Sequence, residues 1–245
     1  MRCTILRLPA AVLLLCGATS VWAFSTGPPA SRTSSPAFGI YPAETNCTAC
    51  HSGNALNDPN GKVELLDVPF RYNPGQTYPL RVRLSYSLAD TTGSLNPKWG
   101  FELTAVNPAD GKGVGTFTTP NPGASPLYPD SLKIITASSG TFATSGRQYI
   151  EQTSFATRTD LPSPVEWTVN WTAPLTTPGP VNFYLSGNSA NGTGSTSGDH
   201  IFTGSEITDV YNPAVPASSP ATTAALLLIL ASVGAGALII RRRPA

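Results

Sequence analysis

Charged side chains are scarce in this sequence: Lys, Arg, Asp and Glu make up only 12% of its 245 residues. Five of the 15 basic residues lie near the two ends, so residues 24–220 carry ten basic residues, all 14 acidic residues and a net charge of −4. A weakly acidic body without a basic cluster excludes the electrostatic footprint of a nucleic-acid-binding protein. The composition also lacks the pattern of a helical bundle, and its 40% apolar content excludes a fully disordered chain.

Residues typical of catalytic sites are equally few. The chain has two histidines and one methionine, and neither histidine stands in a recognisable nucleophile motif. It has no Gly-rich phosphate loop and no dinucleotide-binding fingerprint. We therefore expect a protein without enzymatic activity.

The N-terminus has the organisation of a secretory signal over residues 1–23. Arg2 and Arg7 precede a short apolar run, and the Val-Trp-Ala sequence before Phe24 suits cleavage there. The run is too short to remain as a membrane span. Cys16 follows three leucines, in a loose likeness to a lipid-attachment site, but the residue before such a cysteine is normally small. We expect the signal to be removed and the mature body to lie outside the cytoplasm.

The C-terminus predicts a membrane anchor. A Pro, Ala and Ser linker covers residues 211–223, and residues 224–240 then contain no charge and precede three arginines. Seventeen uncharged residues just span a bilayer, and the arginines place the tail in the cytoplasm. The layout resembles the bacterial sorting signals of the PEP-CTERM kind, in which a membrane enzyme removes the tail and the protein is re-anchored or released. A permanent transmembrane helix over residues 224–245 is the alternative.

The body predicts an all-β domain over residues 61–210, preceded by an irregular Pro- and Ser-rich leader over residues 24–60. Four segments alternate apolar and polar residues with period two, the pattern of a strand with one buried face: 78–88, 99–105, 165–171 and 181–185. Shorter strands are expected at 63–70, 114–118, 132–136, 147–155 and 201–207. Because turn signals separate the segments and no helical period appears, we predict an antiparallel β-sandwich. The strand aromatics are expected in the core, with an exposed carbohydrate-stacking platform as the alternative.

Four short motifs in the body carry a resemblance to a known family. They read Y-x-P-G at 72–75, G-F-x-L-x-A at 100–105, W-x-A-P at 171–174 and G-x-V-x-F at 179–183. In this order they resemble the reelin (reeler) domain, and more closely bacterial secreted proteins that carry a related module with variable C-terminal anchors. The resemblance covers about residues 38–207. It implies an immunoglobulin-like β-sandwich used extracellularly, without known catalysis. No cysteine follows Cys50, so the long-range disulfide of animal reelin domains cannot form.

The chemical motif of the chain is C-x-x-C-H, formed by Cys47, Cys50 and His51. This is the spacing for covalent haem attachment. Two thiols three residues apart reach the two vinyl groups of one porphyrin, and the following histidine is placed as proximal iron ligand. The predicted export places the motif where bacteria attach such haems. We therefore predict a haem c held by Cys47 and Cys50, with His51 as iron ligand.

Other readings of this motif stay open. A disulfide between Cys47 and Cys50 would pin the leader to the sandwich. A thioredoxin-like redox site usually needs the motif at a helix N-terminus after a strand. A zinc site would need a fourth ligand, and few are available.

The second histidine, His200, is the candidate sixth iron ligand. It follows a Gly-, Asn- and Ser-rich segment, residues 186–200, which we expect to be a mobile surface loop from which His200 swings over the haem. The alternative is a strand-edge histidine without a ligand role. Asp199, Asn188 and Asn191 make calcium conceivable in this segment, but one carboxylate is too few for a strong site.

Two functions fit these features. The first is a membrane-anchored extracytoplasmic monohaem protein that exchanges electrons with a redox partner or senses a small ligand. The second is a surface binding or adhesion module whose two cysteines form only a structural disulfide.

Overall fold

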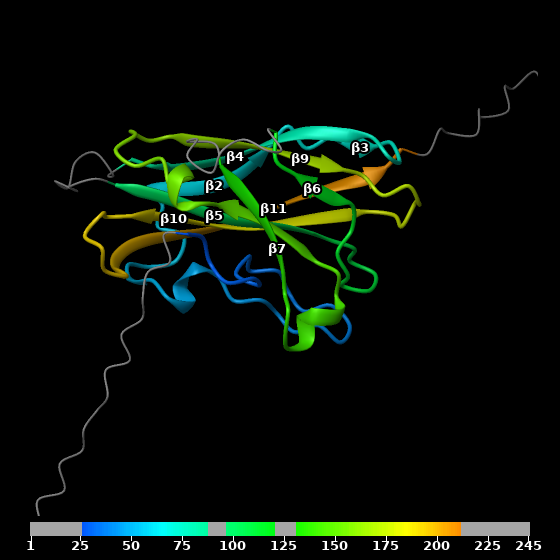
Figure 1. The fold of residues 1–245 in the computed structure, drawn as a ribbon, viewed down its shortest axis with the longest axis horizontal. Coiled ribbons are helices and arrows are strands. Elements are labelled where there is room, and N and C mark those ends of the chain that lie inside the picture. The colour runs from blue at the N-terminus through cyan, green and yellow to red at the C-terminus, as the bar shows by residue number, and fades with distance from the viewer. Residues whose placement is uncertain (1–25, 88–96, 121–130, 212–245) are drawn as a thin grey trace, which may run out of the picture. The chain divides into compact units, whose positions relative to one another are not determined.

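The computed structural model describes residues 26–87, 97–120 and 131–211, which Figure 1 draws in colour. The predicted signal (1–23) and most of the linker and the apolar run (212–245) lie outside these residues. Within the described ranges, no helix is long and apolar enough to cross a membrane.

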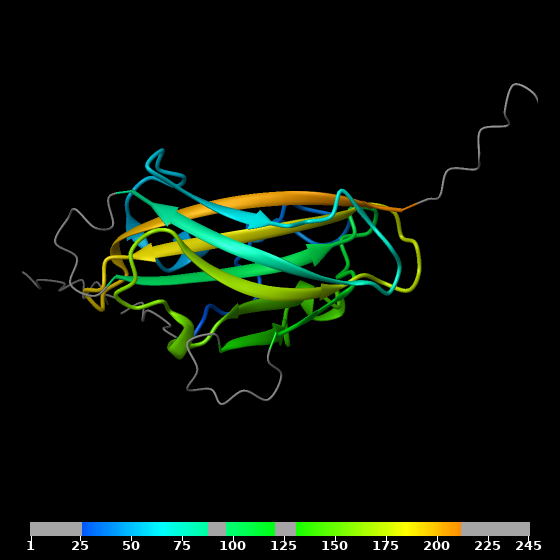
Figure 2. The same cartoon turned by 90° about the horizontal axis from the view of Figure 1, so that it is seen from above.

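Two sheets face each other and form a β-sandwich (Figures 1 and 2). The larger sheet has seven strands in the order β1-β11-β10-β5-β8-β7, and β3 also pairs with β11. Its strands are β1 (Ser52–Gly53), β3 (Arg71–Tyr72), β5 (Lys98–Val106), β7 (Leu132–Thr136), β8 (Gln148–Gln152), β10 (Val181–Ala190) and β11 (Ser197–Val210). The smaller sheet has the order β2-β4-β9-β6. Its strands are β2 (Gly61–Leu66), β4 (Thr77–Tyr86), β6 (Thr116–Thr118) and β9 (Val165–Thr172).

All described pairs are antiparallel except two short parallel pairs, β1 with β11 and β3 with β11. The predicted all-β fold and antiparallel sandwich are therefore confirmed. Period two located the long strands because side chains of a strand alternate between its faces. Among the shorter segments, the one expected at 132–136 is β7, whereas the one expected at 63–70 ends at Leu66 and is followed by the separate strand β3.

The apolar core lies between the two sheets. In the register of β4 with β9, Leu80 is opposite Val169 and both are fully buried. The tryptophans of β5 and β9 are also buried, with exposed fractions of 0 or 1%. Most strand aromatics therefore belong to the core, as expected, and none of those predicted there forms an exposed stacking platform. Fully burying one such side chain contributes on the order of 1.5–3 kcal/mol.

The outer face of the larger sheet is covered by the leader. Figure 1 shows the leader, in blue, on the side of this sheet away from β4 and β9. On β5 and β8, Glu102 and Glu151 point to this face and are cross-strand partners, yet neither is exposed. The backbone N–H of Arg32 in the leader donates to Glu102 Oε2 at 2.5 Å. The leader is irregular, as predicted, but it is docked on the sheet.

A buried ion pair holds the middle of the leader. Arg147 Nη1 lies 2.5 Å from Glu44 Oε1, and both side chains have no exposed area. Glu44 Oε1 also accepts a hydrogen bond from the Tyr149 hydroxyl at 2.7 Å, and its Oε2 accepts one from Thr33. A charge taken out of water needs such partners, because an uncompensated buried charge is costly.

The expectation of a long mobile loop at residues 186–200 is wrong. β10 continues to Ala190 and β11 begins at Ser197, so only residues 191–196 connect them. Three of its polar side chains, Ser186, Asn188 and Asp199, face the leader. Ser186 and Asp199 are buried there and make hydrogen bonds to it. The end of β10 has small or polar residues on both faces, Ser186 to Ala190, so no apolar alternation marks it as a strand.

Candidate functional site

The C-x-x-C-H motif forms a tight turn, the 3₁₀-helix η1 (Cys47–Ala49). Asn46 caps it, since its side chain accepts the backbone N–H of Thr48 at 2.9 Å. The backbone N–H groups of Cys50 and His51 both donate to the carbonyl of Cys47, at 3.2 and 2.9 Å. This turn brings Cys47, Cys50 and His51 to the wall of one cavity.

Backbone pairing directly after the motif places His51 against β11. Ser52 and Gly53 form β1, which pairs with β11 at Ser197 and Asp199. The two chains approach so closely that a Cβ on Gly53 would lie 2.6 Å from the backbone N of Gly198. Gly53 also has a φ of +112°, which side chains other than glycine rarely adopt. The register therefore depends on glycine and brings positions 51 and 199 together.

The imidazole of His51 is held by two residues of the larger sheet. Its Nδ1 lies 2.5 Å from Asp199 Oδ2. Asn188 Nδ2 lies 3.2 Å from Nδ1 and 3.3 Å from Nε2. A nitrogen equally far from both ring nitrogens cannot lie in the ring plane without colliding with the carbon between them. The Asn188 amide therefore lies over the ring face, and the in-plane direction from Nε2 stays open.

Both cysteines are free thiols. Cys47 is buried, and Ser186 Oγ donates to its sulfur at 3.2 Å. Burial raises the pKa of Cys47 to about 12, although the Ser186 hydrogen bond acts in the opposite direction. Cys50 is half-buried. Redox-active thiols have lowered pKa values and sit at helix N-termini or beside cations, so the state of Cys47 does not favour a thioredoxin-like site.

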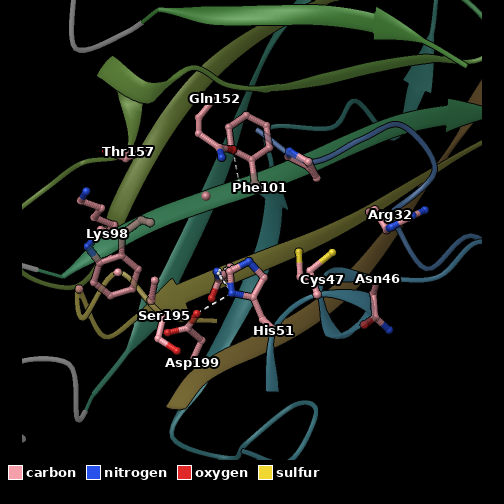
Figure 3. Close-up of a pocket in the computed structure, with 18 of the residues that line it drawn as sticks. Arg32, Asn46, Cys47, His51, Lys98, Phe101, Gln152, Thr157, Ser195 and Asp199 are labelled. Atoms are coloured by element: carbon pink, nitrogen blue, oxygen red, sulfur yellow. Dashed lines mark hydrogen bonds and ion pairs between the residues drawn. The ribbon is translucent and has the colours of Figure 1, made fainter. Parts of the chain in front are cut away.

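The cavity has a volume of about 270 Å³ and lies between the leader and the larger sheet. Figure 3 shows Cys47 and His51 on one side of it, with Gln152 across from them. Pro28, Pro29 and Ala190 add apolar surface, while Arg32 and Lys98 add two cations. The volume is slightly below the range of about 300–1,000 Å³ typical of small-molecule sites.

Two polar atoms on the cavity wall have no hydrogen-bond partner. Arg32 Nε and Asn188 Oδ1 are buried, and neither has a partner among the described residues. Buried polar groups are normally satisfied. These atoms therefore indicate room for a polar group of a ligand.

The structure does not bring His200 to the motif. His200 follows Asp199 in β11, so its side chain points to the opposite face of the sheet. There its Nε2 lies 2.9 Å from the Tyr86 hydroxyl, its ring stacks on Tyr86, and its Nδ1 lies 3.5 Å from Asp58. Burial lowers the pKa of His200, with Asp58 opposing that shift.

The residues considered for calcium have other partners. Asp199 Oδ2 contacts His51, and Asp199 Oδ1 accepts the backbone N–H of Asn191 at 3.0 Å. Asn191 Oδ1 in turn accepts from the backbone and hydroxyl of Thr193. In the described ranges, no three His, Cys, Asp or Glu side chains gather as a group able to hold a metal ion.

The contact of Asp199 with His51 and the position of Arg32 and Lys98 at the cavity could not be predicted from the sequence. No local signal marks them. Asp199 is 148 positions from His51, and only the pairing of β1 with β11 joins the two.

No known family model and no curated protein matches this chain. Among solved structures, it is similar to the Reelin-N domain of F-spondin, with 16% identity, a TM-score of 0.36, and 68% of this chain and 96% of that chain covered. It is also similar to a fragment of the human F-spondin reeler domain, with 16% identity and a TM-score of 0.34, and 66% of this chain and 91% of that chain are covered. For a cohesin module from a Clostridium perfringens family 33 glycoside hydrolase, the identity is 12% and the TM-score 0.38, and 61% of this chain and 96% of that chain are covered. Similarities this low carry no argument about family or function. The reelin resemblance therefore stays a prediction from the sequence motifs, while the β-sandwich that it implies is observed.

Proposed function

We propose that this chain is an extracytoplasmic β-sandwich protein that carries a covalently attached c-type haem and uses it in electron transfer or haem-based sensing. The observation that carries the proposal is the placement of the motif: Cys47, Cys50 and His51 line one cavity, and both thiols are free. In this proposal, the two sulfurs would hold the porphyrin and His51 Nε2 would ligate the iron. A bound haem supplies one iron that exchanges single electrons or binds a small molecule.

The surrounding residues suit such a group. The cations Arg32 and Lys98 at the cavity match the two propionate carboxylates of a haem, which bind guanidinium and ammonium groups well. The unpartnered Arg32 Nε and Asn188 Oδ1 offer polar contacts. A porphyrin is larger than this cavity, so part of it would extend into solvent, which suits electron exchange with a partner protein.

The uncharged C-terminal run supports a proposal on where the protein lies in the cell. Residues 224–240 and the arginines that follow support anchoring in the membrane with the sandwich outside the cytoplasm. Removal of the tail by a sorting enzyme would instead re-anchor or release the protein.

The test is an absorption spectrum of the full chain made in a host that attaches c-type haem, with a pyridine haemochrome assay after denaturation. We expect a Soret band and haem that stays on the denatured chain. Both should be lost in Cys47→Ala and Cys50→Ala. Thr48→Ala is the matched control, because it changes a variable position of the motif and should keep the haem.

A colourless wild-type protein would overturn the haem proposal. If its two cysteines then resisted alkylation until reduced, they would be bonded to each other. That result would leave an anchored sandwich that binds a surface ligand, with the motif as a structural disulfide.

A further inference from the structure

The carboxylate of Asp199 is almost fully buried, with 1% of the residue exposed, and both of its oxygens have partners. Oδ1 accepts the backbone N–H of Asn191 at 3.0 Å, which fixes the orientation of the group. Oδ2 lies 2.5 Å from His51 Nδ1. A carboxylate oxygen that accepts a hydrogen bond at this distance requires a proton on Nδ1. In a neutral His51, the lone pair is then on Nε2.

We propose that Asp199 is the positioning residue of this site: it selects the Nδ1–H tautomer of His51, keeps Nε2 free as an iron ligand, and lowers the reduction potential of the bound haem. The inference rests on the proposed haem function and names the residue that tunes it. Nothing in the C-x-x-C-H motif supplies this carboxylate, which comes from β11.

Three contacts make the arrangement rigid before any haem binds. The pairing of β1 with β11 holds the backbone on either side of the contact. Asn54 Nδ2 donates to the backbone carbonyl of Asp199 at 3.1 Å. The Asn188 amide lies over the His51 ring and limits its rotation. A ligand oriented in advance loses little freedom when it binds iron.

The expected effect on the iron follows from the donor strength of the imidazole. A metal-bound histidine that donates its other N–H to a carboxylate is a more basic ligand than one that donates to a neutral group. A stronger donor stabilises ferric iron more than ferrous iron. The Asp199 contact therefore lowers the potential of the ferric/ferrous couple, which suits a protein that gives electrons readily.

The first test needs no haem. The full chain, ¹⁵N-labelled at histidine and made without haem attachment, is measured by NMR, with His200→Gln used to assign the two rings. We expect an Nδ1–H signature for His51 in the wild type. Asp199→Asn should shift it toward the Nε2–H tautomer that predominates in free histidine, and Asp199→Glu should restore part of the wild-type state. Asp209→Asn, an exposed change on the same strand, is the matched control.

The second test measures the midpoint potential of the haem-loaded chain. Asp199→Asn should raise the potential, while Asp209→Asn should leave it at the wild-type value. A wild-type His51 in the Nε2–H state, or an Asp199→Asn variant with unchanged tautomer and potential, would overturn the inference. The two proposals fail separately: a chain without haem contradicts the proposed function, whereas a haem whose potential ignores Asp199 contradicts only the positioning role.

Discussion

The two faces of the larger sheet are buried by different chemistry. Its inner face packs on the smaller sheet through aromatic and aliphatic side chains such as Phe101 and Leu103. Its outer face packs on the leader through hydrogen bonds and ion pairs, including Glu102 with the Arg32 backbone and Arg147 with Glu44. The chain's two histidines follow this division, with His51 on the outer side and His200 on the inner side. Apolar burial is insensitive to pH, whereas buried carboxylates make the outer face respond to it.

The largest expected effect is in the apolar core that covers the inner face. Trp167 is 1% exposed, and its Nε1 donates to the carbonyl of Ala156 at 2.7 Å. Trp167→Ala should lower the free energy of unfolding by about 3–5 kcal/mol, because it leaves a large cavity and an unpaired carbonyl. Urea unfolding of the full chain should show one cooperative transition at a lower midpoint. Leu175→Ala, at an 87% exposed position, is the control, and an equal loss there would contradict the assignment of the core.

The next largest effect is expected where the leader packs on the outer face, and it should leave the inner face intact. Arg147→Met removes the cation opposite Glu44 but keeps a long side chain. We expect a loss of about 3 kcal/mol, the lower end of the range for breaking a buried pair, because Thr33 and Tyr149 still donate to Glu44.

Hydrogen exchange should locate the Arg147→Met effect in residues 26–50, with the inner-face strands still protected. Arg83→Met at an exposed ion pair should change little. Global loss of protection in Arg147→Met would mean that the two faces are not energetically separate.

The stability of the outer face, unlike that of the inner face, should depend on pH. Burial raises the pKa of Glu151 to about 7, although Lys133 at 2.9 Å opposes the shift. Because the folded-state pKa lies above the unfolded value of 4.5, stability is highest below about pH 4.5 for this group. This stabilisation is lost as the pH rises from 4.5 through 7, by on the order of 3 kcal/mol. Glu151→Gln should flatten the pH dependence of the unfolding midpoint, and an unchanged slope would show that Glu151 does not cause it.

The smallest expected effect is at the edge where the leader meets β11. Gly53→Ala places a Cβ against the backbone of Gly198 at a positive φ. We expect a loss of roughly 1–2 kcal/mol and a displacement of His51 from Asp199, visible as a changed His51 NMR signal. Ser52→Ala at the neighbouring exposed position should leave that signal in place. If Gly53→Ala did the same, the pairing of β1 with β11 would not be what positions His51.

The long strands β4 and β9 of the smaller sheet could be predicted, because each has one apolar face and one more polar face. Val82 and Leu84 alternate with arginines, and Trp167 and Val169 alternate with polar residues. The period-two pattern of a strand can therefore be recognised in the sequence. The C-x-x-C-H spacing likewise predicted that Cys47, Cys50 and His51 lie close together, because the turn is local. The segment at 186–200 could not be predicted in the same way. Its buried face is polar, and a polar strand looks like a loop until its partner is known.

His200 shows the same limit from the other side. Its position in a polar segment made it a candidate ligand, but the extension of β11 directs it to Tyr86. Asp199, its neighbour, points to the motif because adjacent strand residues face opposite ways. A shift of one residue in register would exchange the two.

The sequence by itself determined the all-β class, the long strands, the apolar core and the motif of two thiols and a histidine, since these depend on local spacing and alternation. Only the tertiary structure decided that the leader docks on the sheet, that Asp199 contacts His51, and that His200 does not. Those contacts join residues 70 or more positions apart. They depend on strand register and on buried polar pairs, which leave no periodic mark in the chain.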